Sequence, residues 1–374
     1  MGGALRDRLL GLPLPEVDAA VSGDAEAIAG DLERAGHGRA VFLSRDRPGP
    51  RVFRVAGERP LDVAELEGGS IETDLARRDF TVNAMALEIS DGALLDPYGG
   101  IEHLRRRRLR AVRDENLRED PLRALRAARF VATHGLVPDP TLLRAARRAA
   151  VEFGRVAPER ATAELARLLG APHAAAALRW AVRANLLAPA LGVGAREAAR
   201  VARALAVLED PGIARLNAER RRRLRLALLT LRLGGTAAAA RTFLSRRRWG
   251  REEARRAADL GGLVRAARGL RTRPEFWAWI LEAERGGLLE DATILLARLG
   301  PAARRRGRAL AHIARSPRKR VRVSGDDVVR WLAVRPGPIV GDLLARLRVA
   351  VAMGEVFSRR KARHWLSGQV LKGG

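Results

Sequence analysis

The stretch PLPEVDAA, residues 13–20, places two carboxylates, Glu16 and Asp18, on either side of a single valine. In a β-strand, residues two apart project from the same face, so the two carboxylates can converge on one ion. Paired oxygen ligands suit Mg²⁺, which can bridge a triphosphate. We therefore expect a metal site at Glu16 and Asp18. The alternative is a solvated strand end, which is the more common reason for such a pair.

The segment before this pair, GGALRD at residues 2–7, predicts a short helix that starts at two glycines. A Gly-Gly turn allows backbone amides to come close to phosphate groups. We expect Gly2, Gly3 and Arg6 to lie on the phosphate side of the same cleft.

A second polar segment, DLARRDFTVNAMAL at residues 74–87, leads into a predicted strand. It brings Arg77, Arg78, Asp79 and Asn83 close together in the sequence. Aspartate and asparagine are poor choices inside an amphipathic pattern unless they bind something. The segment is therefore a candidate binding site, with ordinary surface charge as the alternative explanation of the two arginines.

Composition points to a nucleic-acid partner. The 374 residues are 47% hydrophobic, enough for two or more packed units, and 70 Lys and Arg against 43 Asp and Glu give a net charge of +27. Such a charge favours polyanions, although a genome-wide bias toward arginine is an alternative. The chain has no cysteine, which favours a reducing cytoplasm. Its apolar runs are too short for a signal peptide or a membrane span.

The chain changes character near residue 104. Before it, short runs with strand character are separated by Gly, Pro and Asp turns, at residues 40–44, 51–57, 61–66 and 86–97. Residues 23–36 predict a helix that begins near Asp24 and ends at Gly36. After Leu104, apolar residues recur at spacings of three and four, which is typical of helices. The sequence therefore predicts a small domain of strands and helices followed by an all-helical region.

Four segments occur in order along the first part of the chain: GGALRDRLLGLPLPEVD, RRDFTVNA, DPYGGIEHL and REDPLRALRAARF. Together they closely resemble the class II tRNA nucleotidyltransferase and bacterial poly(A) polymerase family, most densely over residues 2–165. The resemblance implies an α+β fold with a nucleotidyltransferase palm, built on a mixed sheet with helices, followed by an all-helical neck, body and tail. The implied ranges are 1–104 for the palm, 105–170 for the neck with its nucleotide-selecting helix, 171–320 for the body and 321–374 for the RNA-binding tail.

The resemblance also implies a reaction. In the family, an acid-x-acid pair holds two Mg²⁺ ions, which makes Glu16 and Asp18 the expected metal ligands and catalytic residues. A third catalytic carboxylate matches Asp62 in LDVAEL. The implied chemistry is in-line attack of an RNA 3′-hydroxyl on the α-phosphate of CTP or ATP. The expected partners are the acceptor arm of tRNA, CTP and ATP.

Nucleotide-binding residues follow from the same motifs. RRDFTVNA implies that Arg77, Arg78, Asp79 and Asn83 lie near the ribose and the triphosphate. DPYGG implies a flexible joint between palm and neck.

In the motif EDPLR, residues 119–123, Asp120 and Arg123 are three apart and would share one face of a helix. The family uses this pair as a protein template that selects C or A, with Glu119 positioning the arginine. Arg126 follows in the same motif and is also an expected nucleotide-binding residue. A plain helix start, rich in acids and with an early proline, is the alternative.

The chain departs from the family pattern in four places. Glu16 stands where the family has Asp, and His103 stands where Asp usually follows DPYGG. The family has a strand and a helix before Gly-Gly, whereas this sequence begins at Met1. The stretch before DLARRD is shorter than the loop that helps CCA-adding members to switch from C to A. We expect a tRNA 3′-end nucleotidyltransferase that adds all or part of CCA, with a poly(A) polymerase or a weakened RNA-binding paralogue as alternatives.

Overall fold

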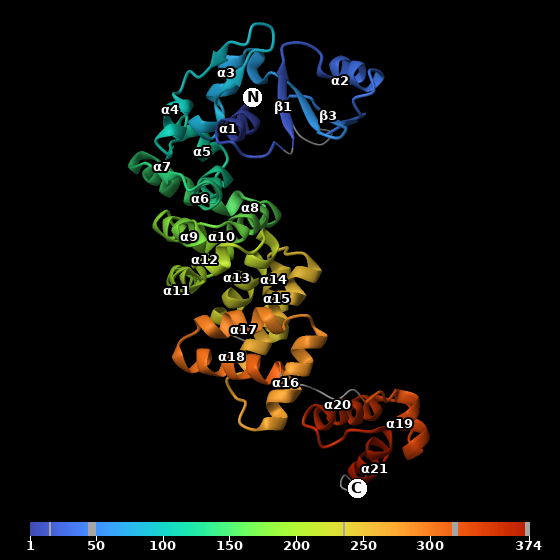
Figure 1. The fold of residues 1–374 in the computed structure, drawn as a ribbon. Helices are drawn as coiled ribbons and strands as arrows, with labels where there is room; N and C mark the ends of the chain where they lie inside the picture. The colour runs from blue at the N-terminus through green and yellow to red at the C-terminus, as the bar shows by residue number, and fades with distance from the viewer. Residues whose placement is uncertain (15, 44–49, 235, 316–320, 371–374) are drawn as a thin grey trace. The chain divides into compact units, whose positions relative to one another are not determined.

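The computed structural model describes residues 1–14, 16–43, 50–234, 236–315 and 321–370. The chain separates into two compact units, Met1–Glu209 and Asp210–Gly374, and Figure 1 shows the elements of each. The finer division into palm, neck, body and tail stays a prediction.

The first unit begins with a four-stranded mixed sheet. Its strands are β1 (Val17–Val21), β2 (Arg39–Phe42), β3 (Val52–Ala56) and β4 (Leu61–Glu65). The strand order is β1-β4-β3-β2, with β1 and β4 parallel and the other pairs antiparallel. The helix α2 (Ala25–Arg34) starts at Asp24, whose side chain accepts from the backbone N–H groups of Glu26 and Ala27, as expected of an N-cap.

One face of this sheet is apolar and the other is charged. Phe53, Val55 and Val63 are buried with Ala25 and Ala29 of α2 in one cluster. Because successive strand residues point to opposite faces, the residues between them project from the other side, where α2 does not lie. That uncovered face carries the predicted acidic residues.

The remaining elements of the first unit form two groups: short helices and strands up to residue 109, and mainly longer helices after it. The first group is α1 (Gly2–Leu9), η1 (Glu67–Gly69), α3 (Ile71–Ala76), η2 (Thr81–Asn83), β5 (Ala86–Leu87), β6 (Leu94–Leu95), α4 (Gly100–Arg105) and β7 (Arg108–Leu109). The second group is α5 (Asp114–Glu119), α6 (Leu122–His134), β8 (Val137–Pro138), α7 (Pro140–Ala150), η3 (Phe153–Arg155), α8 (Pro158–Gly170), α9 (Ala174–Arg183), α10 (Leu187–Leu191), α11 (Ala195–Leu205) and η4 (Ala206–Leu208).

The helix α6 is the centre of this helical part, because it packs against both α8 and α9. Three of its alanines, Ala124, Ala127 and Ala128, are completely buried. Such small side chains let neighbouring helices approach closely. The position of α6 matters for the site, since its first turns face the charged side of the sheet across a cavity.

The second unit is entirely helical over the residues that the structure describes. Its helices are α12 (Pro211–Ala214), α13 (Ala218–Leu233), α14 (Ala237–Arg246), α15 (Arg251–Ala266), α16 (Arg273–Arg285), α17 (Leu289–Arg298), α18 (Pro301–Ala314), α19 (Gly325–Leu332), α20 (Pro338–Ala352) and α21 (Arg359–Val370). Trp249, between α14 and α15, is buried with 6% of its surface exposed.

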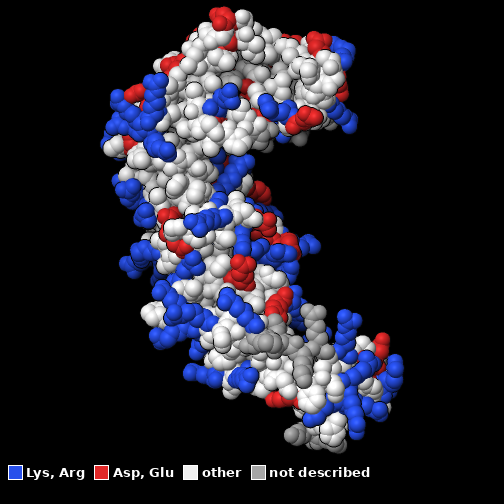
Figure 2. Space-filling view, viewed as in Figure 1, with Lys and Arg blue, Asp and Glu red and all other residues white. Residues whose placement is uncertain are grey.

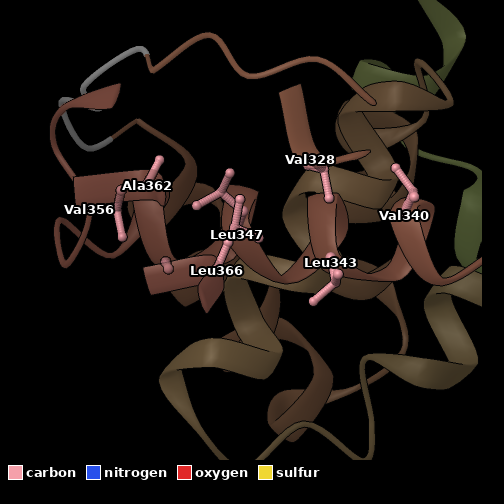
Figure 3. Packing of buried hydrophobic residues seen from close by; sticks show 8 residues of the cluster. Val328, Val340, Leu343, Leu347, Val356, Ala362 and Leu366 are labelled. Atoms are coloured by element: carbon pink, nitrogen blue, oxygen red, sulfur yellow. The ribbon is translucent and has the colours of Figure 1, made fainter. Parts of the chain in front are cut away.

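The last three helices have a hydrophobic core of their own. Figure 3 shows Val328 of α19 with Leu343 and Leu347 of α20, and Leu366 of α21 belongs to the same buried cluster. In this segment, the helical spacing expected after Leu104 thus corresponds to three helices that pack together.

The predicted α+β fold class is confirmed, and β2 to β6 overlap the predicted runs. The prediction of an all-helical region after Leu104 was wrong in one respect, because β7 and β8 form a short parallel pair. Strands of two residues are too short to show a strand pattern in the sequence. Ser44, the end of the first predicted run, lies outside the described residues. In the described part of the chain, none of the helices combines the length and the apolar character needed to cross a membrane.

Replacing Leu347 with alanine tests the core of the last three helices. Because Leu347 is 3% exposed, we expect a local destabilisation of about 2–4 kcal/mol, measured as faster hydrogen exchange in α19–α21. Ile339→Ala is the matched control, since Ile339 lies in the same helix with 56% of its surface exposed. Equal effects of the two substitutions would contradict this packing.

A second test concerns acid stability of the second unit. Arg298 donates to Asp210 through Nε at 2.6 Å and Nη2 at 2.9 Å. These bonds, with backbone N–H groups of Ile213 and Gly212, hold the pKa of Asp210 below its usual value. A lowered pKa contributes stability above the unfolded value of about 3.9, and this contribution is lost as pH falls through the folded value.

We therefore expect Arg298→Gln to cost about 1 kcal/mol at pH 7. The difference from wild type should shrink below pH ~4, as followed by thermal unfolding. Arg265→Gln, at an exposed position of α15, is the control and should show neither effect. A difference that persists unchanged at low pH would rule out the Asp210 carboxylate as the cause.

Candidate active site

A cavity of about 440 Å³ lies between the uncovered face of the sheet, α1, the segment at residues 74–83 and the start of α6. Arginines from these elements line it: Arg6, Arg77, Arg78, Arg123, Arg126 and Arg129. Carboxylates also line it: Asp18, Glu65, Glu67, Asp74 and Asp79. A concave site rich in guanidinium groups suits a ligand with several phosphate charges.

Three charged side chains lie in one row across the sheet. The register pairs Asp18 with Asp62 and Asp62 with Arg54, and directly opposite residues project from the same face. Arg54 donates to both oxygens of Asp62, through Nε at 2.6 Å and Nη2 at 2.8 Å. Its Nη2 also donates to Glu16 Oε2 at 2.9 Å. Glu16 precedes β1, and its carboxylate contacts Arg54.

Asp18 has different surroundings from Glu16. It lines the cavity, and no donor in the described part of the chain forms a hydrogen bond or ion pair with its carboxylate. Burial raises the pKa of Asp18, and the nearby carboxylates of Asp62 and Glu16 act in the same direction against the N-terminal ammonium and Arg78. The charged form of Asp18 is therefore poorly compensated by the protein.

Contacts with the segment at residues 74–83 and with Met85 fix the start of α1. Gly2 has a φ of +62° and donates its N–H to the carbonyl of Met85 at 2.9 Å. A Cβ at Gly2 would lie 3.1 Å from Nη1 of Arg78, so both the backbone angle and the close approach favour glycine. Four residues later, Arg6 lies over the ring of Phe130 at 4.9 Å and donates to Asn83 Oδ1 at 2.5 Å.

A second contact ties α1 to α6. The carboxylate Oδ1 of Asp7 lies 3.4 Å from Nε2 of His134 and 2.7 Å from Arg6 Nη2. Burial would raise the pKa of Asp7, but His134 and Arg6 outweigh it and the pKa is lowered. His134, the last residue of α6, thus anchors α1. The predicted residue Gly3 lines the cavity beside these contacts.

The two arginines of RRDFTVNA both line the cavity and both have acidic partners. Arg77 pairs with Glu67 at 2.6 Å, and Arg78 donates to Asp74 Oδ2 through Nε at 3.0 Å and Nη2 at 2.7 Å. Asp74 is buried, whereas Arg77 is half exposed. These pairs hold the guanidinium groups at the cavity while leaving other donors of each fork for a ligand.

Asp79 and Asn83 are buried polar residues of the same segment, RRDFTVNA. Asp79 Oδ1 accepts from the N–H of Phe80 at 2.8 Å and from Asn83 Nδ2 at 2.9 Å. Arg126 Nη2 lies 3.1 Å from Asp79 Oδ2, which joins this segment to α6. Asp79 and Asn83 are each only 5% exposed, so these polar partners are needed for their burial.

Asn116 of α5, which the sequence reading did not single out, supports this segment from behind. Its Nδ2 donates to the carbonyls of Ala76 and Arg78, both at 2.8 Å, and it is 4% exposed. It therefore fixes the backbone on either side of Arg77. A lone asparagine in the helical segment DENLRE was the only available signal.

The prediction that Asp120 and Arg123 share a helix was wrong in one respect. Asp120 has extended backbone angles and lies between α5 and α6, because Pro121 starts the next turn and disfavours helix in the residue before it. Its Oδ1 accepts from the N–H of Leu122, and its Oδ2 accepts from Arg160 Nη2 at 2.7 Å. Asp120 thus lies at the start of α6 rather than within a helix.

Arg123 reaches the cavity from the first turn of α6. Its Nη1 donates to the carbonyl of Arg77 at 2.7 Å and to that of Asn116 at 3.3 Å. Glu119 is exposed at the end of α5, and in the described structure it makes no ion pair or hydrogen bond with Arg123. The predicted positioning of Arg123 therefore comes from two backbone carbonyls.

The joint predicted at DPYGG has a local structural role. The carboxylate of Asp96 accepts from the N–H of Gly100 at 2.6 Å and of Ile101 at 2.9 Å, which caps α4. Gly100 has no room for a side chain, since a Cβ would lie 2.3 Å from the carbonyl of Thr81. Flexibility at this joint stays a prediction.

The structure brings most of the predicted site residues to one cavity. Those that line it are Gly3, Arg6, Asp18, Arg77, Arg78, Asp79, Asn83, Arg123 and Arg126. Gly2, Glu16, Asp62, Glu119 and Asp120 lie outside its lining. In the part of the chain that the structure describes, no three carboxylate, imidazole or thiol side chains are placed so that they could hold a metal ion together.

Comparison with known proteins gives matches along the chain. A family model for the poly(A) polymerase head domain matches residues 1–110. The CCA-adding enzyme of Geobacillus stearothermophilus is 32% identical over 386 residues, covering 98% of this chain and 91% of that protein. The CC-adding tRNA nucleotidyltransferase of Geobacter sulfurreducens is 30% identical over 403 residues, covering 99% and 91%. The A-adding tRNA nucleotidyltransferase of Deinococcus radiodurans is 44% identical over 180 residues, covering 47% and 40%.

A solved structure is similar as well. The crystal structure of the Bacillus stearothermophilus CCA-adding enzyme in complex with CTP superimposes with a TM-score of 0.70 at 29% identity, covering 99% of this chain and 92% of that one. With identity of this level over nearly the whole length, the chain belongs to the class II tRNA nucleotidyltransferase and poly(A) polymerase family of nucleotidyltransferases.

Proposed function

We propose that this protein is a tRNA 3′-end nucleotidyltransferase that adds all or part of CCA from CTP and ATP without a nucleic-acid template. The observation that carries the proposal is one cavity that contains both the unpaired carboxylate of Asp18 and a wall of arginines. We call Arg6, Arg77, Arg78, Arg126 and Arg129 the arginine wall. Family membership supports the reaction type. The relatives named for CCA, CC and A addition support the tRNA end as substrate.

The arginines suit the triphosphate of the incoming nucleotide. A nucleoside triphosphate carries about four negative charges, and forked guanidinium groups bind phosphate oxygens in pairs. Arg78 and Arg126 are held by Asp74 and Asp79 at fixed points of the wall. Such fixed donors stabilise charge that develops on the leaving pyrophosphate with little reorganisation.

The carboxylates on the sheet suit the Mg²⁺ ions, two of them, that the family implies. The charge of Asp18 is poorly compensated, and burial together with Asp62 and Glu16 raises its pKa, so an added cation fits there. Asp18 would hold it first, and Asp62 and Glu16, which are bound to Arg54 in this structure, would contribute only on release from that arginine. When bound, such ions activate the attacking hydroxyl and neutralise phosphate charge.

The reaction needs a 3′-hydroxyl and an α-phosphate brought into line. The hydroxyl oxygen loses its proton to solvent and forms a bond to the α-phosphorus. The bond from that phosphorus to the pyrophosphate oxygen breaks, and pyrophosphate leaves with the electron pair. In this protein the arginine wall would bind and orient the triphosphate, while Asp18 lies in the same cavity where the hydroxyl must enter. The protein's contribution is mainly position and charge.

Base selection is assigned to Arg123 and Asp120, as the family motif implies. In the described structure Arg123 uses Nη1 for two backbone carbonyls, so Nη2 and Nε remain available to a base edge. Asp120 offers acceptor oxygens, although Arg160 holds one of them. Donor and acceptor together can distinguish cytosine from adenine by hydrogen bonding.

The acceptor arm of tRNA is the proposed partner of the helical region, with residues 321–374 as an RNA-binding tail. In the view of Figure 2, Lys and Arg side chains outnumber those of Asp and Glu on the surface of each unit. The net charge of +27 supports binding to a phosphate backbone. The cytoplasm stays the predicted location, on the absence of cysteine from the sequence.

Nucleotide incorporation tests the function. The protein is incubated with tRNA lacking CCA, Mg²⁺ and labelled CTP or ATP, beside an Asp18→Ala variant. We expect C or A to be added by the wild type, and a loss of at least about 100-fold in the variant, since Asp18 carries the unpaired carboxylate.

The product pattern decides among the family activities. Addition of C alone or A alone would define partial CCA addition, and long A tails on unrelated RNA would mean a poly(A) polymerase. If the wild type incorporates neither nucleotide while still binding tRNA, the weakened RNA-binding paralogue replaces the proposed enzyme.

Replacing Arg123 with alanine tests base selection. We expect the preference between CTP and ATP to fall by about tenfold or more, because donors to the base edge are lost while the arginine wall remains. Binding to tRNA should change little. Arg118→Ala is the control, because Arg118 is exposed on the preceding helix and does not line the cavity. Equal losses of selection and of tRNA binding would contradict the template role.

A further inference from the structure

We propose that Arg54 is a positioning residue that serves as a resident cation: it neutralises Glu16 and Asp62 in the metal-free protein, and a divalent ion must compete with it for these carboxylates. The inference rests on the proposed metal-dependent function. Under this inference, the affinity for a divalent ion is lowered by Arg54, a residue outside the arginine wall.

The geometry of Arg54 supports this role. Its guanidinium is bidentate to Asp62, with N–O distances of 2.6 and 2.8 Å, and Nη2 extends to Glu16 at 2.9 Å. One side chain thus bridges two of the three carboxylates expected to bind metal. The third, Asp18, lacks a hydrogen-bonding or ion-pairing partner among the described residues. This division leaves Asp18 as the carboxylate that remains open to a cation from solution.

The sheet register makes the bridge a built feature. Arg54 is directly opposite Asp62 on β3 and β4, and Asp62 is directly opposite Asp18 on β4 and β1. The strand β3 has Phe53 and Val55 buried on the other face, so strand alternation fixes the direction of Arg54. The arginine cannot turn to the opposite face without disrupting that core.

The bridge also explains what glutamate at position 16 does. Glu16 precedes β1 and must reach across β4 to meet Arg54 on β3. An aspartate would end about 1.3 Å earlier, since its side chain is one methylene shorter. The longer acid therefore makes the contact with Arg54 possible from this position, at the cost of being tied to it.

The energetic consequence follows from charge. Three carboxylates close together on one face of the sheet repel one another when all are charged. Arg54 supplies one positive charge, close to Asp62, whose side chain is 19% exposed. Removing that charge leaves the acids without compensation, which destabilises the metal-free protein and strengthens its attraction for a divalent ion.

The test measures Mn²⁺ binding by electron paramagnetic resonance and thermal unfolding at increasing Mg²⁺, on full-length protein without RNA or nucleotide. For Arg54→Gln we expect a dissociation constant for Mn²⁺ at least about fivefold lower than for wild type. The metal-free unfolding temperature should fall, and Mg²⁺ should raise it more than in wild type.

Arg51→Gln is the matched control. Arg51 lies directly before β3 and also bridges carboxylates: it pairs with Glu26 and lies 3.6 Å from Asp24 and 3.7 Å from Glu65. Its loss removes the same charge from a position three residues before Arg54 without removing a partner of Glu16 or Asp62. We expect Mn²⁺ affinity to change by less than about twofold, because the partners of Arg51 are not the carboxylates expected to bind metal and exposed charges are screened by solvent.

Two further variants decide the matter if Arg54→Gln does not fold. Arg54→Lys keeps the charge but not the fork, so it should bind Mn²⁺ with intermediate affinity. Glu16→Asp should loosen the bridge and also bind Mn²⁺ more tightly than wild type. Equal or weaker Mn²⁺ binding in these variants overturns the inference and would make Arg54 a support for the ligands. Failure of the proposed function is a separate result, because it shows as absent nucleotide incorporation with metal binding intact.

Discussion

The buried carboxylate of Asp79 holds together parts of the chain that are far apart in sequence. It accepts from the backbone of Phe80 and from Asn83, and it pairs with Arg126 of α6. Through Asn83 it also reaches Arg6 of α1. A carboxylate that is 5% exposed is stable only with such partners, so its burial and the assembly of the arginine wall depend on each other.

The sequence was informative where a pattern is local. Short runs of strand-forming residues between Gly, Pro and Asp turns predicted β3 and β4, and Asp24 correctly marked the start of α2. The order of the motifs then indicated residues that the structure brings to one cavity. A single sequence could not show how strands pair, so it could not place Arg54 opposite Asp62. Nor did it separate Asp120 from the helix, because the restriction imposed by Pro121 competes with a strong helical pattern around it.

Asn116 shows another limit. Its value lies in two carbonyls about forty positions earlier in the chain, and nothing in the residues around it indicates such distant acceptors. The signal for Arg54, by contrast, was present: it is a charged residue alternating with Phe53 and Val55 in a strand, on the face that carries the acids. Residues such as Asn116 and Arg54, which position other residues of a site, are harder to find from sequence patterns than the residues that they position.

The cavity wall closes only when α5 and α6 are in place. The head-domain similarity ends at residue 110, whereas Asn116, Arg123 and Arg126 come after it. A fragment cut at that boundary would keep the acids of the sheet. It would lose Asn116, Arg123 and Arg126, whose N–H groups contact the segment at residues 74–83. A fragment that keeps the whole cavity is thus longer than the matched head domain, and during synthesis the cavity is complete only after the ribosome has passed α5 and α6.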